Sequence, residues 1–281
     1  DPQTGETQPL THCFLVSNID SYALATGPMF HGKYQESPCW KIVNSGKYSD
    51  IIPDSHLCIK RECDGAISCN AGHIYDTDVT DPKSLSKAYV TGRRLASALR
   101  DALAEFHPKA FINSRVTSTA QLMGIRESRR IIGDYVLTVD DYFKRKTFPD
   151  EICRNSYWID LHPPKEVAQS NKCSADANAY EREQNNYKNY EKYKDGESHG
   201  IPYRCLTPKG LRNVLVAGRC ISTERTVQAS TRIMPACYST GEAAGIGAAL
   251  AAKRADADVH KIDVQQLRES YLKYGGYLPK Q

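Results

Sequence analysis

Two arginines and a histidine have residue types suited to ligand binding and proton transfer. Arg126 and Arg129 are three residues apart. If their segment were helical they would share one face, and two guanidinium groups could then converge on one anionic or carbonyl group. His162 is the proton-transfer candidate, because the ordinary pKa of histidine, about 6.5, lies near neutrality. We predict catalytic roles for these three residues, assisted by Arg204.

The same residues also have purely structural explanations. Arg126 and Arg129 could pair with Glu127, Asp134 or Asp140 only to hold a loop. His162 precedes two prolines and could be a hydrogen-bonded histidine at a strand end.

A group of cysteines and histidines raises the question of a metal. Cys58, Cys63 and Cys69, with His56 and His73 nearby, could in principle ligate zinc. They lack the short Cys-x-x-Cys pair of common structural sites. We therefore predict no metal site, and cysteines that are mainly reduced.

Composition excludes several classes of protein. The chain has 281 residues, 40% of them hydrophobic and 25% charged, with a net charge of +4. Basic and acidic residues are interspersed, which argues against nucleic acid as a partner. The longest apolar stretch, Ile246 to Ala252, is far too short for a membrane span, so we expect a soluble chain. No targeting segment is recognisable, the chain does not begin with Met, and we expect it to begin within a longer protein, so the compartment stays undetermined.

The first part of the chain predicts a sheet and one long helix. Short apolar runs bounded by turn residues indicate strands. The helix begins with Asp81 as N-cap and Pro82 as its first residue, and it ends at His107-Pro108. The runs that we interpret as strands are Phe14–Val16, Trp40–Asn44, Ile51–Ile52 and Leu57–Ile59.

The stretch 175–198 is rich in tyrosine and polar residues and has almost no aliphatic side chains. Tyr180, Tyr187, Tyr190 and Tyr193 could stack on a ligand ring. We favour an exposed insertion or a partner-facing loop.

The last third changes character. Val214–Ala217 is a continuous apolar run closed by Gly218, which is typical of a strand in a buried parallel sheet. A helix rich in small residues is expected at about Ala236–Arg254. A second is expected from an Asp263 N-cap to Tyr274.

Two segments carry a family resemblance. They are Gly124–Thr138, which reads GIRESRRIIGDYVLT, and Leu215–Gly245, which contains LVAGRCIS, ASTRIMP and GEAAG. Further blocks are Tyr157–His162 and Ile201–Leu206. Together they closely resemble FAD-dependent oxidoreductases related to the fumarate reductase flavoprotein group, over about residues 65–252.

The resemblance implies that Leu215–Gly245 closes over the flavin end of FAD. A helix beginning near Pro235 would place its unpaired N–H groups toward the negative charge that develops on the reduced flavin. Where many relatives have an acidic residue after the glycine, this chain has Arg219, which suggests a contact to phosphate, to a neighbouring carboxylate, or a structural ion pair. For Gly247, tight packing of the helix explains a small residue as well as a close approach to the cofactor does. The expected cofactor-binding residues are Gly218, Arg219, Cys220, Ile221, Arg232, Met234, Pro235, Gly241, Glu242, Ala243 and Ala244.

No strand–GxGxxG–helix unit occurs in the chain, so the resemblance predicts a fragment that alone holds FAD weakly and is inactive. We expect a mixed α/β fold: a substrate-binding domain over residues 1–205, then the C-terminal part of a Rossmann-like FAD-binding domain over 206–281. The predicted activity is hydride transfer between an unknown small organic substrate and flavin N5, with an N-terminal FAD-binding segment as a further partner. The alternative is a binding or structural module that has lost FAD.

Overall fold

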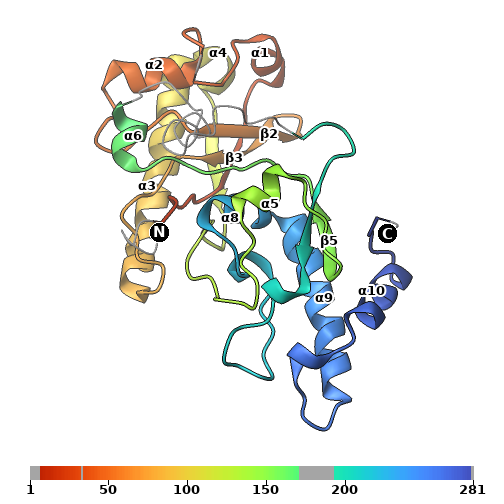
Figure 1. Cartoon of the computed structure of the whole chain (residues 1–281). Helices are drawn as coiled ribbons and strands as arrows, with labels where there is room; N and C mark the ends of the chain where they lie inside the picture. The colour runs from red at the N-terminus through yellow and green to blue at the C-terminus, as the bar shows by residue number, and fades with distance from the viewer. Residues whose placement is uncertain (1–6, 33, 171–192, 280–281) are drawn as a thin grey trace. The chain divides into compact units, whose positions relative to one another are not determined.

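A computed structural model describes residues 7–32, 34–170 and 193–279. These residues form two compact units (Figure 1). Unit A comprises residues 7–126 and 162–170, and unit B comprises 127–161 and 193–279. Both combine helices with antiparallel strands, which confirms the mixed α/β class. The units do not follow the division at residue 205, and the functional roles expected for 1–205 and 206–281 stay predictions.

Unit A is built on a four-stranded antiparallel sheet in the order β2-β3-β1-β4. Phe14 pairs with Cys69 on one side and with Thr119 on the other. The strands predicted at Phe14–Val16 and Leu57–Ile59 are confirmed. The strands are β1 (Phe14–Ser17), β2 (Leu57–Cys63), β3 (Ala66–Ala71) and β4 (Arg115–Thr119).

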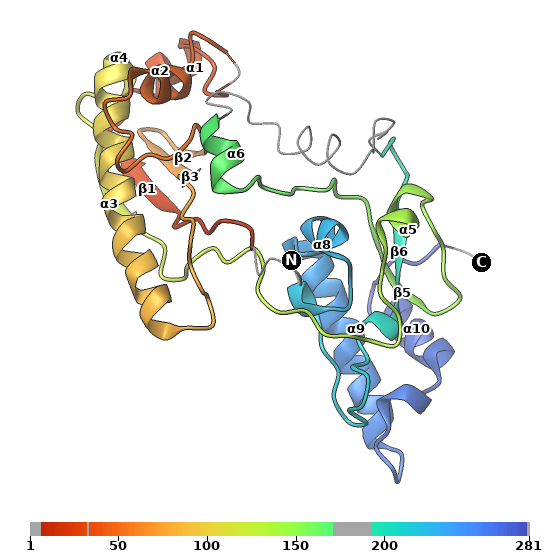
Figure 2. The ribbon, with the colours of Figure 1, turned by 60° about the vertical axis from the view of Figure 1, so that its left-hand side comes forward.

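The long helix α3 (Pro82–Phe106) lies along this sheet, as Figure 2 shows. Its start is as predicted: the Asp81 side chain accepts hydrogen bonds from the backbone N–H groups of Lys83 and Ser84. Leu95, Leu99 and Leu103 are at most 3% exposed, so one stripe of the helix closes the core of the unit. The shorter helices of unit A are α1 (Ser21–Thr26), α2 (Pro38–Ser45), α4 (Pro108–Phe111) and α6 (Lys165–Ser170).

The strand predicted at Trp40–Asn44 is wrong, because these residues belong to helix α2. The Ser37 hydroxyl accepts from the Cys39 N–H at 3.1 Å, and Pro38 occupies the first helical position. Capping chemistry therefore outweighed the short apolar run. The run Ile51–Ile52 lies in a turn rather than in a strand.

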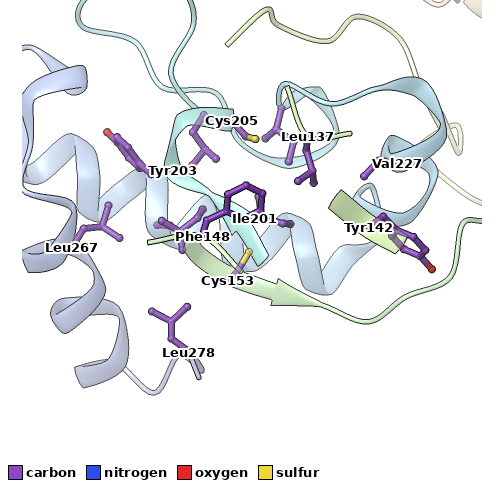
Figure 3. Packing of buried hydrophobic residues seen from close by; sticks show 14 of the residues in the cluster. Leu137, Tyr142, Phe148, Cys153, Ile201, Tyr203, Cys205, Val227, Leu267 and Leu278 are labelled. Carbon is purple, nitrogen blue, oxygen red and sulfur yellow. The ribbon is translucent and has the colours of Figure 1, made fainter. Parts of the chain in front are cut away.

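Unit B packs two strands and its helices around one core (Figure 3). Strands β5 (Glu151–Asn155) and β6 (His199–Pro202) pair antiparallel. Tyr142, Ile201 and Leu267 are completely buried there. Both predicted helices are present, as α9 (Met234–Ala252) and α10 (Val264–Lys273), the latter capped by Asp263. The remaining elements are α5 (Val139–Phe143), α8 (Arg225–Thr231) and the 3-10 turns η1 (Tyr203–Cys205), η2 (Gly218–Cys220) and η3 (Val259–Lys261).

The buried parallel strand predicted at Val214–Ala217 is wrong for this structure. The segment forms no ladder, and Val214 is 38% exposed. Its Val216 N–H donates to the Leu206 carbonyl at 2.9 Å. An apolar run becomes a strand only where a neighbouring strand bonds to it, and both sheets of the described residues are antiparallel.

Most of the tyrosine-rich stretch, including Tyr180, Tyr187 and Tyr190, lies outside the described residues. Tyr193 is described and is half-buried. Its ring stacks on Tyr142 at 4.7 Å, and its hydroxyl donates to the Tyr142 carbonyl at 2.8 Å. The end of the expected exposed insertion is therefore anchored on the core of unit B.

Two further features bear on the expected class of protein. No helix among the described residues is long and apolar enough to cross a membrane. Each of the nine cysteines in the described ranges carries a free thiol.

Candidate functional site

Three histidines of unit A lie in contact beside a buried aspartate. His73 Nδ1 is 2.8 Å from Asp54 Oδ2, and His73 Nε2 is 3.0 Å from His162 Nδ1. His56 stacks face to face on His73, with ring centroids 4.1 Å apart and planes inclined by 6°. The structure thus links His162 through His73 to the Asp54 carboxylate.

Asp54 is the hub of this cluster. Its Oδ2 also accepts from the Tyr75 hydroxyl at 2.8 Å, and its Oδ1 accepts from the His56 backbone N–H at 2.9 Å. Burial alone would raise the pKa of the Asp54 carboxyl, but His73 and the hydrogen bond from the His56 backbone N–H hold that pKa well below its ordinary value. Asp54 is therefore an ionised carboxylate inside the protein.

Two groups close to Asp54, His56 and Tyr75, stay uncharged for related reasons. Burial, aided by the positive potential of His73, His162 and Arg126, lowers the pKa of His56 well below its ordinary value. Burial, and then the charge of Asp54, raises the pKa of the Tyr75 hydroxyl. Tyr75 therefore acts toward Asp54 as a hydrogen-bond donor.

A cavity of about 300 Å³ lies beside His73 and Tyr75. Asp76 in its wall has φ +55°, a backbone conformation that residues other than glycine seldom adopt. Lys165 pairs with Asp76 at 2.6 Å. The other lining residues include Ser49, Asp50, Ser84 and Lys87.

Sequence reasoning singled out His162 but missed its partners. His73 and His162 are 89 positions apart, and no spacing rule connects them. Of the cysteines considered with His56 and His73, Cys58 and Cys63 are exposed and Cys69 is buried in strand β3.

The three imidazoles could hold a metal by ligand count, since one nitrogen from each lies within 4.8 Å of the others. The parallel stack of His56 on His73 opposes this, because the lone pairs of imidazole lie in the ring plane. Two parallel rings direct these lone pairs along parallel planes rather than toward one ion.

Arg126, predicted to be catalytic, is buried in unit A. It donates to the Pro9 carbonyl at 2.7 Å and to the Thr11 hydroxyl at 2.9 Å. Residues 125–132 form no helix, so the spacing of three does not put Arg126 and Arg129 on one helical face. Arg129 is exposed.

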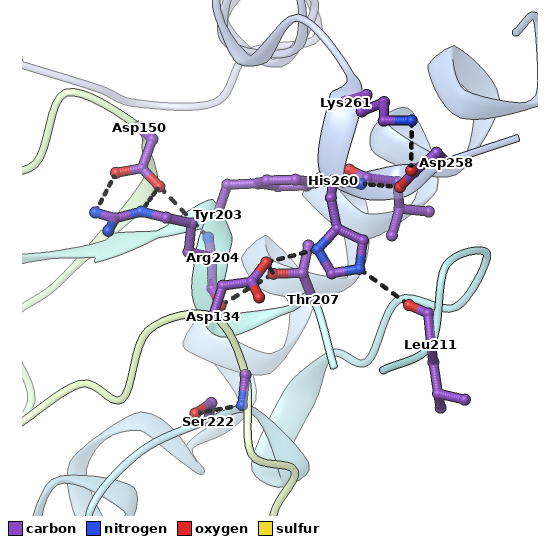
Figure 4. Close-up of polar contacts among 12 residues, drawn as sticks. Asp134, Asp150, Tyr203, Arg204, Thr207, Leu211, Ser222, Asp258, His260 and Lys261 are labelled. Atoms are coloured by element: carbon purple, nitrogen blue, oxygen red, sulfur yellow. Dashed lines mark hydrogen bonds and ion pairs between the residues drawn. The ribbon is translucent and has the colours of Figure 1, made fainter. Parts of the chain in front are cut away.

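Arg204, the third predicted arginine, forms a two-point ion pair with Asp150. Its Nε and Nη2 donate to the carboxylate at 2.9 and 3.1 Å (Figure 4). Its guanidinium also lies over the Tyr135 ring, 5.0 Å from the centroid. These contacts account for the position of Arg204 without a ligand.

The acidic residues considered as partners of Arg126 and Arg129 have other partners. Glu127 is 1% exposed and lies between Arg130 and Arg225, at 3.6 and 3.2 Å. Asp134 binds His260 Nδ1 at 2.6 Å (Figure 4). A hydrogen bond to the Leu211 carbonyl and the Asp134 contact raise the pKa of His260.

The expected cofactor-binding residues include an exposed helix start beside a glycine turn. Gly218 has φ +74°, a value suited to glycine, and its N–H donates to the Thr240 hydroxyl of α9 at 3.1 Å. Helix α9 begins after Ile233, and the Ile233 side chain supplies no capping hydrogen bond. Met234 is 68% exposed, and a Cβ added at Gly241 would meet no atom within 4 Å. Arg219, Pro235 and Glu242 are exposed as well.

Other residues expected to bind the cofactor pack in the core or form ion pairs within the protein. Ile221 and Ala243 are at most 1% exposed and belong to the core, while Cys220 and Ala244 are half-buried. Arg232 donates to the backbone and carboxylate oxygens of Asp160 at 2.8 and 2.9 Å. For Gly247, tight packing is favoured, since an added Cβ would lie 3.1 Å from the Tyr203 ring.

Comparison with known proteins adds one match. A family model described as FAD dependent oxidoreductase matches residues 2–270. No curated protein and no solved structure shows a significant match.

Proposed function

The chain belongs to the family of FAD dependent oxidoreductases, and from this membership we propose that it takes part in hydride transfer between a small organic substrate and flavin N5. When bound, FAD supplies the redox chemistry, and the protein supplies binding, orientation and proton transfer. We further infer, from the blocks at 124–138 and 215–245, a relationship to the fumarate reductase flavoprotein group. On this proposal residues 1–205 serve substrate binding, and residues 206–281 complete a Rossmann-like FAD-binding domain.

The observation that carries the cofactor proposal is the start of α9. A helix of 19 residues leaves unpaired N–H groups and a partial positive charge at its first turn. The N-cap residue Ile233 supplies no side-chain hydrogen bond to these groups, and Met234 and Pro235 are exposed. A polar or negatively charged part of FAD is a suitable partner for them. We propose that Gly218, Arg219, Met234, Pro235, Gly241 and Glu242 hold the cofactor.

His162 is proposed as the proton-transfer residue. Hydride transfer to or from a substrate carbon is commonly paired with proton transfer at a neighbouring heteroatom. The hydrogen bond from His162 Nδ1 to His73 supports this role, because it orients the ring.

The arginines are proposed as substrate-binding residues. Arg129 is the strongest candidate, since it is exposed, and an arginine binds carboxylates in a two-point geometry. Arg126 and Arg204 have the internal contacts described above. They can bind substrate only if these contacts break, or if the same guanidinium group contacts the substrate as well.

Absorption spectroscopy of the intact protein, isolated from the cells that produce it together with any segment that precedes these residues, tests the cofactor proposal. We expect flavin bands at about one FAD per chain. Gly241→Leu should lower FAD content at least tenfold, because the new side chain projects into open space beside α9 and displaces what binds there. Ala252→Leu, on an exposed position at the other end of the helix, is the matched control and should retain FAD.

A colourless protein that takes up no added FAD would refute the proposal and favour a binding module without cofactor. Equal FAD content in the Gly241 and Ala252 variants would refute the assignment of FAD to the region of Gly241 in α9.

A further inference from the structure

The Asp54 carboxylate fixes the donor in the first of the two hydrogen bonds that run from Asp54 through His73 to His162. An ionised carboxylate only accepts hydrogen bonds, so His73 donates to Asp54 through Nδ1. In the state in which His73 carries only this one proton, its Nε2 presents a lone pair to His162, so His162 donates through its own Nδ1. In this state the ring proton of His162 is on Nδ1 and its basic lone pair is on Nε2.

We propose that Asp54 and His73 are positioning residues for His162, and that they make His162 Nε2 the atom that takes up or releases the proton. The inference rests on the proposed role of His162 in proton transfer. The new elements are the tautomer of His162, the identity of Nε2 as its reacting atom, and the two residues, Asp54 and His73, that determine both.

Asp54 and His73 also stabilise the positive charge that appears when His162 takes up a proton. A proton arriving at Nε2 turns His162 into an imidazolium. The Nδ1 proton of His162 can then pass to His73 Nε2, which leaves His162 neutral and places the positive charge on His73, next to the Asp54 carboxylate. In total, one proton binds to the histidine pair, and the positive charge that it brings lies on His73 and not on His162. A charge paired over 2.8 Å is far less costly in a buried site than an unpaired one.

The surroundings hold this arrangement in place. Tyr75 donates to the same carboxylate oxygen as His73, and the His56 backbone N–H occupies the other oxygen. The ring of His56 covers one face of His73, so His73 cannot rotate freely. The charged and titratable groups that face these rings are Asp54, His56, Tyr75, Arg126, His162 and Glu166.

Nitrogen NMR of protein labelled with ¹⁵N-histidine tests the tautomer directly, with or without flavin. Near pH 8 we expect His162 to show a protonated Nδ1 and an unprotonated Nε2, with signals assigned from their loss in His162→Gln. A protonated Nε2 together with an unprotonated Nδ1 in the unaltered protein would overturn the inference.

Asp54→Asn should reverse the tautomers. The backbone N–H of His56 needs an oxygen, so the amide nitrogen of the new side chain will face His73 Nδ1. His73 must then carry its proton on Nε2, and His162 must carry its proton on Nε2 as well. Flavin content should not change.

Asp64→Asn is the matched control, because that side chain is 85% exposed on the turn between β2 and β3. It should leave the tautomers of His73 and His162 unchanged. Unchanged tautomers in a folded Asp54→Asn protein would overturn the inference. Stoichiometric binding of Zn²⁺ that shifts the nitrogens of all three histidines would do so too, and would make them metal ligands. A protein without flavin would refute the proposed function and leave the tautomer result standing.

Discussion

Buried His199 should make unit B less stable as the pH falls from 7 to 5. The side chain is completely buried in strand β6. The Tyr193 hydroxyl gives its proton to the Tyr142 carbonyl, so His199 Nδ1 donates to the Tyr193 oxygen at 2.7 Å. Among the described residues His199 Nε2 is buried without a hydrogen-bond partner. A proton on Nε2 would therefore have no acceptor.

The size of the effect follows from the pKa of His199. Burial lowers it to about 3, with a further contribution from Arg154. In the unfolded chain a histidine has a pKa of about 6.5. Because the folded pKa is depressed, the unfolded state takes up the proton first, and stability falls as the pH drops from 6.5 toward 3. Between pH 7 and pH 5 the linked loss is about 2 kcal/mol.

Urea unfolding at the two pH values measures this loss. The chain has two tryptophans, and Trp158 lies in unit B, so its fluorescence in a Trp40→Phe background follows that unit. The fall in unfolding free energy between pH 7 and pH 5 should be about 2 kcal/mol smaller in His199→Gln than in the parent. His260→Gln is the control of opposite sign, because the raised pKa of His260 stabilises the folded state at pH 5, and its removal should steepen the fall. Equal falls in the parent and in His199→Gln would refute the reasoning.

Two further predictions concern stability in unit A. Gly92→Ala should cost about 1–3 kcal/mol, since the added Cβ would lie 2.5 Å from the Cβ of His12, and urea unfolding followed by Trp40 fluorescence in a Trp158→Phe background measures it. A stability equal to the parent would mean that α3 does not approach His12 so closely. Asp81→Ala should cost about 1 kcal/mol by the same assay, because the N–H groups of Lys83 and Ser84 lose their acceptor, whereas Asp81→Asn should keep most of the stability. Equal losses in both Asp81 variants would argue against capping.

The sequence by itself determined the features that depend on neighbours within one turn of chain. Asp81-Pro82 and Asp263 predicted two helix starts correctly, because a capping side chain bonds to N–H groups two or three residues ahead. The same local chemistry at Ser37-Pro38 was present in the sequence and was overlooked in favour of the apolar run Trp40–Asn44. The blocks around Gly124–Thr138 and Leu215–Gly245 indicated the family to which the chain belongs.

Tertiary structure alone decided the features that need a partner from a distant part of the chain. Val214–Ala217 has the composition of a buried strand, but a strand requires a neighbour to bond to, and no ladder forms at this segment of the described chain. Arg126 has the charge of a substrate-binding residue, yet folding places it against the carbonyl of Pro9. His162 was a candidate by residue type alone. Its tautomer and its link to Asp54 arise because folding brings together side chains separated by 89 residues, and a hydrogen bond depends on distance in space, which sequence spacing does not contain.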